Sequence, residues 1–260
     1  MNKQDLISIL KPTFKSFIKL NKSNKEETLT SSKIGGIPYW PKSKEYPKIN
    51  KEPLKLIAQI NLAELSEKIN PRVVSPHLPS KGILQFFFVY NDDSYGAFKG
   101  SYVFYHEDIT EEHYLDSRIK NINLNHKNMP FNDSFTIDFS IQNELLGLLD
   151  RYNRLKFEEI FDDIDLDDDE ICEILYDSIE FKNSGNKMGG YAFFNQEDPI
   201  VYASEESLLP DDLILLLQLD TEKELGLNWG ENGIANWRIS GSDLQIFNFE
   251  NISYNWDCEL

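Results

Sequence analysis

The sequence has little positive charge for its length. Its 260 residues include 26 Lys and Arg against 44 Asp and Glu, which leaves a formal net charge of −18. No segment gathers the basic residues that a phosphate backbone requires, and the acidic balance repels nucleic acid. We therefore exclude nucleic acid as a partner and expect the electrostatic field to favour a basic protein or a cationic ligand.

Cysteine and long apolar runs are also scarce. Cys172 and Cys258 are far apart and neither lies in a CxxC pair, which predicts free thiols in a reducing compartment, with one disulfide between them as the alternative. No apolar stretch reaches the roughly 18 residues of a membrane span. Because Lys11, Lys15 and Lys19 interrupt the N-terminal region, it does not resemble a signal peptide. We expect a cytoplasmic protein with no membrane partner.

Motifs for catalysis or metal binding are missing as well. The sequence contains no HExxH, GxSxG, Walker or GxGxxG pattern, the local signatures of several enzyme classes. The acidic run at 162–169 begins like a calcium loop. However, Asp168 stands where that loop needs glycine and Ile174 where it needs glutamate, so helix capping is the better interpretation. We expect no metal and no cofactor, and we assign no catalytic residue.

Apolar and aromatic side chains, by contrast, are plentiful, at 40% and 13% of the residues. A chain of this length buries roughly 70% of the surface that its unfolded form exposes, so it needs no disulfide or metal to hold a core. The length permits one large domain or two small ones. We predict a single compact domain over residues 1–260.

Two distant segments share the same order of residue types. Residues 32–40 and 186–194 both contain a lysine, an apolar residue, two glycines and then two aromatic residues. An internal duplication is the simplest cause. It predicts a first repeat over about 30–110, an insert over about 111–184 and a second repeat over about 185–260.

Further blocks continue the match in the same order along the chain. The matched pairs are 56–61 with 216–220, 82–88 with 233–239, and 104–109 with 247–252. Runs of β-branched and aromatic residues bounded by Gly, Pro, Asn and Ser are typical of strands. Both repeats are therefore predicted to be β-rich and mostly antiparallel.

Helices are expected outside the two repeats. Apolar residues recur at helical spacing over 6–18, with Pro12 dividing the stretch. Residues 135–141 alternate with period two and predict a strand, and helices are predicted after it, over 143–161 and from 167 onward. The predicted class is α+β, with two repeated β-rich halves and N-terminal and central helices.

Polar residues present in both repeats are the candidate binding residues. Lys33 and Lys187 lie beside the glycine pairs, and Gln59 and Gln218 lie inside apolar strands. One interpretation makes each glutamine a buried hydrogen-bonding group and each lysine a charge over an aromatic face. The other places all four around a cleft between the halves. The tryptophans that would line this cleft are Trp40, Trp229 and Trp237.

Several glycines are predicted to be structural. A glycine pair is expected where the backbone needs a positive φ or a close approach, and no helix N-terminus follows that would make it a phosphate loop. The structural glycines are Gly35, Gly36, Gly82, Gly189, Gly190 and Gly233.

The same segments resemble a known family. Residues 32–41, 56–62 and 78–88 are similar to the YwqG family of bacterial proteins of unknown function, and the second half agrees around Gly189-Gly190 and Trp229-Gly230. The likeness covers nearly the whole chain, with Ala192 standing where the family pattern has proline. It implies an α+β fold with duplicated β-rich halves in the bacterial cytoplasm, and it implies no established activity or cofactor.

A binding or protein-interaction role is the function that we expect. The chain is acidic, aromatic-rich and free of catalytic motifs, so a basic protein or a small molecule is the expected partner. The alternative is an enzyme with a dispersed active site in the cleft between the repeats. That alternative requires Lys33, Lys187 and His106 to converge around at least one strongly perturbed titratable group.

Overall fold

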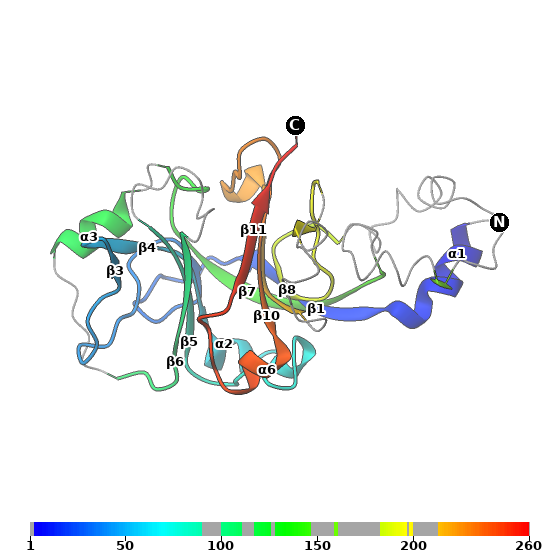
Figure 1. Cartoon of the computed structure of the whole chain (residues 1–260), viewed down its shortest axis with the longest axis horizontal. Helices are drawn as coiled ribbons and strands as arrows, with labels where there is room; N and C mark the ends of the chain where they lie inside the picture. The colour runs from blue at the N-terminus through cyan, green and yellow to red at the C-terminus, as the bar shows by residue number, and fades with distance from the viewer. Residues whose placement is uncertain are drawn as a thin grey trace.

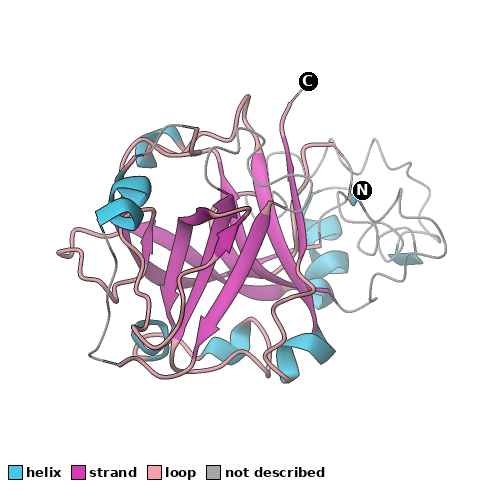
Figure 2. Cartoon of the chain, turned by 60° about the vertical axis from the view of Figure 1, so that its left-hand side comes forward, coloured by secondary structure: helices cyan, strands magenta, loops and turns pink. Residues whose placement is uncertain are grey.

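The computed structural model describes residues 3–89, 100–110, 117–125, 128–146, 159–160, 183–196, 198–199 and 213–259. Within these residues the chain forms one eleven-stranded sheet in which every strand pair is antiparallel. The helices are short and lie around the rim of the sheet (Figure 2). The prediction of a mostly antiparallel, β-rich fold is confirmed, with few helices among the described residues.

The strands are β1 (Lys15–Lys22), β2 (Lys33–Ile34), β3 (Lys48–Ile49), β4 (Glu52–Asn61), β5 (Ile83–Val89), β6 (Ser101–His106), β7 (Phe135–Glu144), β8 (Lys187–Gly189), β9 (Leu213–Asp220), β10 (Ile234–Ser240) and β11 (Ser253–Asp257). The α-helices are α1 (Lys3–Leu10), α2 (Leu62–Ser66), α3 (Ser117–Leu124) and α6 (Gly241–Gln245). The 3₁₀ turns are η1 (Lys11–Thr13), η2 (Pro71–Val73) and η5 (Lys223–Leu225).

The long strands β1 and β7 form the centre of the sheet. Outward from them the order is β8, β9, β10 and β11 on the β1 side, and β2, β4, β5 and β6 on the β7 side. We call β2, β4, β5 and β6 the first wing, and β8 to β11 the second wing. The short strand β3 pairs only with β4, outside this order.

The sheet bends so that its two wings face each other across an aromatic core. The rings of Phe86 and Phe88 lie 5.5 Å and 6.0 Å from the ring of Trp237, between centroids. Trp229 lies 6.1 Å from both Phe88 and Trp237, and Trp237 Nε1 donates a hydrogen bond to Ser101 Oγ at 2.7 Å. Strands β5 and β6 accordingly lie beside β10 and β11 in Figure 1. The aromatic rings of the two wings fill the space between them.

Short helices begin where two of the strands end. The Asn61 side chain at the end of β4 accepts hydrogen bonds from the N–H groups of Ala63 and Glu64 in α2. At the end of β10, Ser240 accepts a hydrogen bond from Asp243 N in α6. Both residues are preferred N-caps because a short side-chain oxygen satisfies backbone donors that have no partner within the helix.

Most predicted strands are confirmed. The segments 56–61, 135–141 and 216–220 lie in β4, β7 and β9, and the two segments that follow a glycine lie in β5 and β10. The prediction for 247–252 is wrong, because the last strand begins at Ser253. Its aromatic residues instead pack from the segment between α6 and β11: the rings of Phe247 and Phe249 lie 5.3 Å and 5.8 Å from that of Tyr105.

The N-terminal helix is confirmed only in its first part. Helix α1 ends at Leu10, Pro12 lies in the turn η1, and the chain is a strand from Lys15. Phe17 and Ile18 are buried between β7 and β8, so sheet pairing overrides their helical spacing.

The start of the first central helix is also wrong. Strand β7 continues through Asn143 to Glu144, where its pairing with β1 ends. Of the remainder of that helix, the structure describes only 145–146, which are not helical, and 159–160, which are helical. The helix predicted from 167, the acidic run at 162–169 and Cys172 lie outside the described residues.

Candidate functional site

The two glycine pairs have the backbone that the sequence predicts. All four residues have positive φ, between 64° and 76°, a region that glycine enters without steric cost. A Cβ on Gly36 would lie 2.6 Å from Glu27 Oε1, and a Cβ on Gly190 would overlap Glu144 Oε1. The second glycine of each pair therefore lets a carboxylate approach the backbone.

Lys187 forms a fully buried ion pair with the second of these carboxylates. Its Nζ donates to Glu144 Oε1 at 2.9 Å and to Oε2 at 2.7 Å, with side-chain exposures of 0% and 4%. Tyr191 N donates to Glu144 Oε1 at 2.6 Å, and the Phe17 ring lies 5.0 Å from Lys187 Nζ. The charge thus sits over an aromatic face, as one sequence interpretation expected, and is paired as well.

Lys33 occupies a similar but more open environment. Its Nζ donates to Glu27 Oε1 at 3.2 Å and to the carbonyl oxygen of Thr28 at 2.9 Å. Lys33 is 1% exposed, but Glu27 is 33% exposed. Burial lowers the pKa of both lysines, that of Lys187 to about 8, and the neighbouring glutamates oppose this shift by favouring the charged ammonium.

Gln59 and Gln218 are buried and bind the protein backbone. Gln59 Oε1 accepts from Tyr39 N at 2.9 Å, and its Nε2 donates to the carbonyl oxygens of Leu29 and Ser31, both at 2.9 Å. Gln218 makes the corresponding three bonds, to Phe193 N and to the carbonyl oxygens of Asn183 and Gly185. Each glutamine thereby fixes the chain on both sides of a Lys-containing short strand.

The three candidate tryptophans are not brought together. Trp229 and Trp237 are fully buried in the aromatic core between the wings. Trp40 packs elsewhere, in a cluster with Tyr46 and Phe87 on the first wing, and its Nε1 donates to the carbonyl oxygen of Lys44 at 3.1 Å. The two glycines that precede β5 and β10, Gly82 and Gly233, lie where an added Cβ would overlap a backbone carbonyl oxygen.

His106 is the one described histidine that is buried, at 3% exposure. Its ring lies 4.7 Å from that of Trp40, and its Nε2 has no hydrogen-bond partner among the described residues. Burial, with a smaller contribution from the Lys44 ammonium, lowers the pKa of His106 to about 4. The ring is therefore neutral at pH 7. His77 is exposed, and His113 and His126 lie outside the described residues.

A groove of about 750 Å³ opens beside the Lys187–Glu144 ion pair. Its walls come from the start of β1, the end of β7, the segment before β8 and the segment after β9. The lining residues are Phe14, Phe17, Lys19, Gln142, Asn143, Glu144, Asn183, Ser184, Gly185, Asn186 and Glu222. Its size lies within the range of small-molecule sites, about 300–1,000 Å³.

Hydrogen bonds fix the wall of the groove ahead of β8. Asn186 Nδ2 donates to Glu222 Oε2 at 2.7 Å, and Asn186 Oδ1 accepts from Asp220 N at 2.9 Å. Gly185 N donates to Asp220 Oδ2 at 2.7 Å. The Glu222 carboxylate is thus held in place at the groove, which is the arrangement that a preformed site requires.

The sequence predictions named none of these lining residues as a binding candidate. They come from separate chain segments, and none of them belongs to a motif. Among the candidates, Lys187 bonds to the lining residue Glu144, and Gln218 bonds to the carbonyl oxygens of Asn183 and Gly185, but neither candidate lines the groove itself. One available signal was the short polar run 183–186 directly before Lys187, because a polar segment bordering a buried strand is typical of a loop that reaches the surface.

Comparison with known proteins places most of the chain in one family. Residues 32–258 match the family model described as a domain of unknown function, DUF1963. The chain belongs to the DUF1963 family. The matched region contains both wings of the sheet and β7, whereas β1, which lines the groove, precedes it. A search of curated proteins finds no match.

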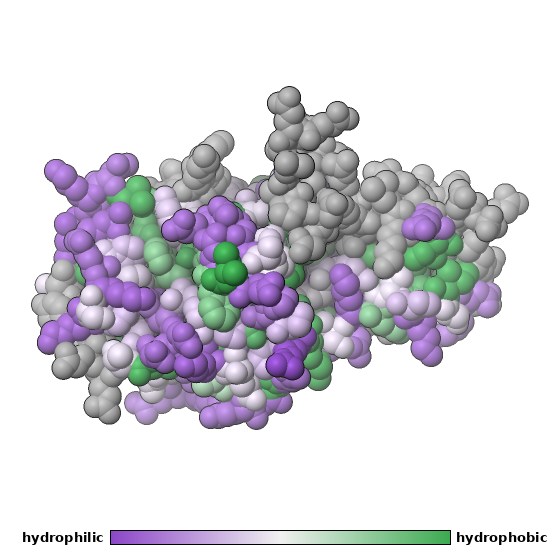
Figure 3. Space-filling view, turned by 60° about the horizontal axis from the view of Figure 1, so that its bottom comes forward, coloured by the Kyte–Doolittle hydropathy of each residue, from purple (hydrophilic) through white to green (hydrophobic). Residues whose placement is uncertain are grey.

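The described residues of this DUF1963 protein are those given above for the fold. No helix in those residues is long and apolar enough to cross a membrane. No group of three or more His, Cys, Asp or Glu side chains in them is arranged to hold a metal ion. The coloured residues on the face drawn in Figure 3 are mostly hydrophilic, with apolar residues among them, as is usual for a folded protein surface.

Proposed function

We propose that this DUF1963 protein is a binding protein that takes a cationic group of its partner, an ammonium or a guanidinium, into the groove. The groove itself carries the proposal: its titratable lining residues are two carboxylates, Glu144 and Glu222, and one ammonium, Lys19. The net charge of −18 over the chain adds a field that draws cations toward the surface.

Glu222 is the residue that we assign to the cation. The charge of Glu144 is already paired with Lys187, whereas the bond that Glu222 accepts from Asn186 comes from a neutral amide. A hydrogen bond from a charged donor to a charged acceptor contributes about 1.5–3 kcal/mol. Phe14, which is 40% exposed, offers a ring face that adds about 0.5–1 kcal/mol to a cation lying over it.

The arrangement of the other titratable candidates supports binding over catalysis. Lys33 is engaged by Glu27, Lys187 by Glu144, and His106 packs against Trp40. The three residues lie on three different strands, β2, β8 and β6, and each has its own partners. An acid–base pair would need two of them within hydrogen-bond reach of one substrate.

We further propose that the protein is a YwqG-like member of its family and acts in the cytoplasm. The support is the sequence likeness around the two glycine pairs and the scarcity of cysteine.

Calorimetric titration with the peptide Gly-Arg-Arg-Gly, and with Gly-Glu-Glu-Gly as its acidic counterpart, tests the proposal. We expect only the basic peptide to bind, and we expect its affinity to fall as NaCl is added. Glu222→Gln keeps the acceptor for Asn186 but removes the charge, so it should weaken binding about tenfold, which corresponds to roughly 1.4 kcal/mol.

Glu224→Gln is the matched control for this substitution. Glu224 is exposed, lies two residues further along the chain and does not line the groove. This variant has the same net charge as Glu222→Gln and should bind like the unsubstituted protein. Equal losses in the two variants, or equal binding of both peptides, would refute the proposal.

A further inference from the structure

The central strand pair contains a two-fold relation. Strand β1 pairs antiparallel with β7, and Asn21 lies directly opposite Asp138. An antiparallel pair has a local two-fold axis through such an opposed pair. Rotation about this axis exchanges Asn21 with Asp138 and superimposes the direction of β1 on that of β7.

Rotation about this axis also exchanges the outer neighbours of the two strands. Strand β1, from the first half of the chain, borders the second wing, and β7, from the second half, borders the first wing. Lys19 of β1 pairs with Lys187 in the second wing. Thr136 of β7 pairs with Lys33 in the first wing. Lys19 lies two residues before Asn21, and Thr136 lies two residues before Asp138. The rotation that exchanges Asn21 with Asp138 therefore also exchanges these two residues and the lysines with which they pair.

The carboxylates obey the same relation. Glu27 lies six residues after Asn21, and Glu144 lies six residues after Asp138. Each glutamate bonds to the lysine of its own half of the chain and lies against the second glycine of that half. This match is independent of strand pairing, because Glu27 is in a loop and Glu144 is in a strand.

The same hydrogen bonds hold the segment after the glycine pair in both halves of the chain. Gln59 and Gln218 accept from equivalent backbone N–H groups, those of Tyr39 and Phe193. The carbonyl oxygens of these two residues accept from the side-chain amides of Gln85 in β5 and Asn236 in β10, both at 2.7 Å.

We propose that the chain consists of two copies of one folding unit that have exchanged their first strands. One unit contains β1 and the first wing, and the other contains β7 and the second wing. This unit is longer than the repeat predicted from the sequence, because it includes the long strand before each Lys-containing strand. The inference does not depend on the function proposed above.

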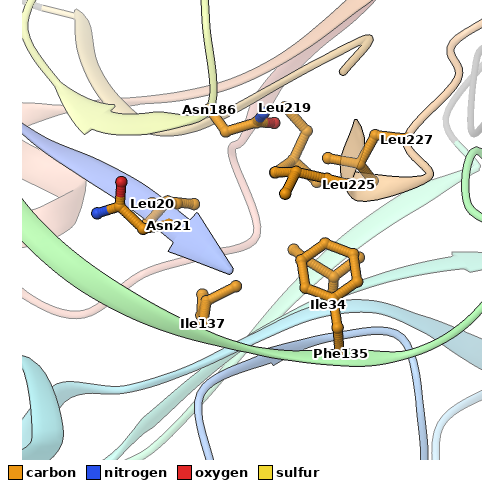
Figure 4. Close-up of a pocket in the computed structure, with 9 residues that line it drawn as sticks. All are labelled: Leu20, Asn21, Ile34, Phe135, Ile137, Asn186, Leu219, Leu225 and Leu227. Atoms are coloured by element: carbon orange, nitrogen blue, oxygen red, sulfur yellow. The ribbon is translucent and has the colours of Figure 1, made fainter. Parts of the chain in front are cut away.

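The exchange makes each half of the sheet depend on the other half of the chain. A cavity of only about 10 Å³ remains where the exchanged strands meet the wings, and Figure 4 shows side chains from both units around it. These residues are Leu20 and Asn21 of β1, Ile34 of β2, Phe135 and Ile137 of β7, Leu219 of β9, and Asn186, Leu225 and Leu227 from the segments that flank β8 and β9. The groove is composite too, since Phe14, Phe17 and Lys19 come from the first unit.

A full-length chain that can be cut between the units tests the proposal. We would insert a protease recognition sequence between Asn132 and Asp133, which are both exposed, and replace Cys172 and Cys258 by serine. Two cysteine pairs related by the two-fold axis are then introduced separately, Ile18→Cys with Met188→Cys and Ile34→Cys with Phe135→Cys. Directly opposed antiparallel residues have Cβ atoms about 4.5–5.5 Å apart, close to the spacing of a disulfide.

After oxidation and cleavage, both pairs should keep the two pieces together as one band on a non-reducing denaturing gel. Ile83→Cys with His106→Cys is the control, because these residues are paired within the first wing and their disulfide cannot join the pieces. Separation of the pieces with both test pairs would overturn the exchange, and crosslinking by one pair alone would overturn the equivalence of the units. In size-exclusion chromatography at high salt, the cut chain without added cysteines should elute as a single particle that contains both pieces. Folded pieces that elute separately would also overturn the exchange.

Discussion

Replacing Lys187 by methionine is the sharpest perturbation of the buried ion pair. Methionine is apolar and of similar length, so the substitution removes the charge with little change in packing. It leaves the Glu144 carboxylate at 4% exposure with only the Tyr191 N–H as a donor from the present cluster. This unpaired buried charge raises the free energy of the folded state, because both carboxylate oxygens have lost their solvation and the carboxylate has lost its counterion.

The expected loss is about 3–5 kcal/mol of unfolding free energy, the usual cost of removing one partner of a buried ion pair. For a chain of this size that corresponds to a fall of roughly 6–20 °C in the melting temperature. Adding Glu144→Gln should recover more than half of the loss, because the amide oxygen still accepts from Tyr191 N and no charge remains. The non-additivity of the two substitutions measures their coupling directly.

Urea unfolding followed by circular dichroism measures these free energies. Lys48→Met is the control, since Lys48 forms a 3.1 Å ion pair with Glu45 at the surface, with exposures of 43% and 83%. Its loss should stay within about 1 kcal/mol. If Lys187→Met costs no more than Lys48→Met, the buried pair does not hold this part of the sheet and the reasoning is wrong.

Other predictions concern the glycine pair and the buried histidine. Gly190→Ala should destabilise the protein by at least about 2 kcal/mol more than Gly185→Ala in thermal unfolding. Both residues have positive φ, but only at Gly190 does the added Cβ overlap Glu144, and Gly185 has nothing within 4 Å. His106 is neutral when folded down to about pH 4, while the unfolded chain binds a proton below about 6.5, so folding stability should fall as pH drops from 6.5 to 4. In the variant His106→Gln, the decrease in unfolding free energy between pH 6.5 and pH 4 should be smaller by up to about 3 kcal/mol. Identical dependence of the unfolding free energy on pH in the two proteins would contradict this.

The strands of the two wings could be predicted from the sequence because their runs of apolar and aromatic residues are typical of buried strands. Strands β4 and β10 are buried over nearly their whole length, and their apolar and aromatic runs show it. The glycine pairs were equally predictable, since two adjacent glycines beside an apolar residue indicate a backbone that side chains would obstruct.

What the sequence did not predict depends on contacts between distant segments. Phe14, Phe17 and Ile18 have helical spacing, yet from Lys15 onward the chain is a strand, because β7 and β8 supply partners on both sides. The groove is formed by separate segments that only the folded sheet assembles, so no local pattern could indicate it.

A titration of the isotope-labelled protein with Gly-Arg-Arg-Gly, followed by NMR, tests the binding site most directly. We predict that the largest changes in backbone amide shifts occur at residues that line the groove, among them Lys19, Asn143, Ser184 and Glu222. Shift changes confined to residues outside the groove, or none at peptide concentrations that saturate the calorimetric signal, would contradict the assignment of the groove as the site.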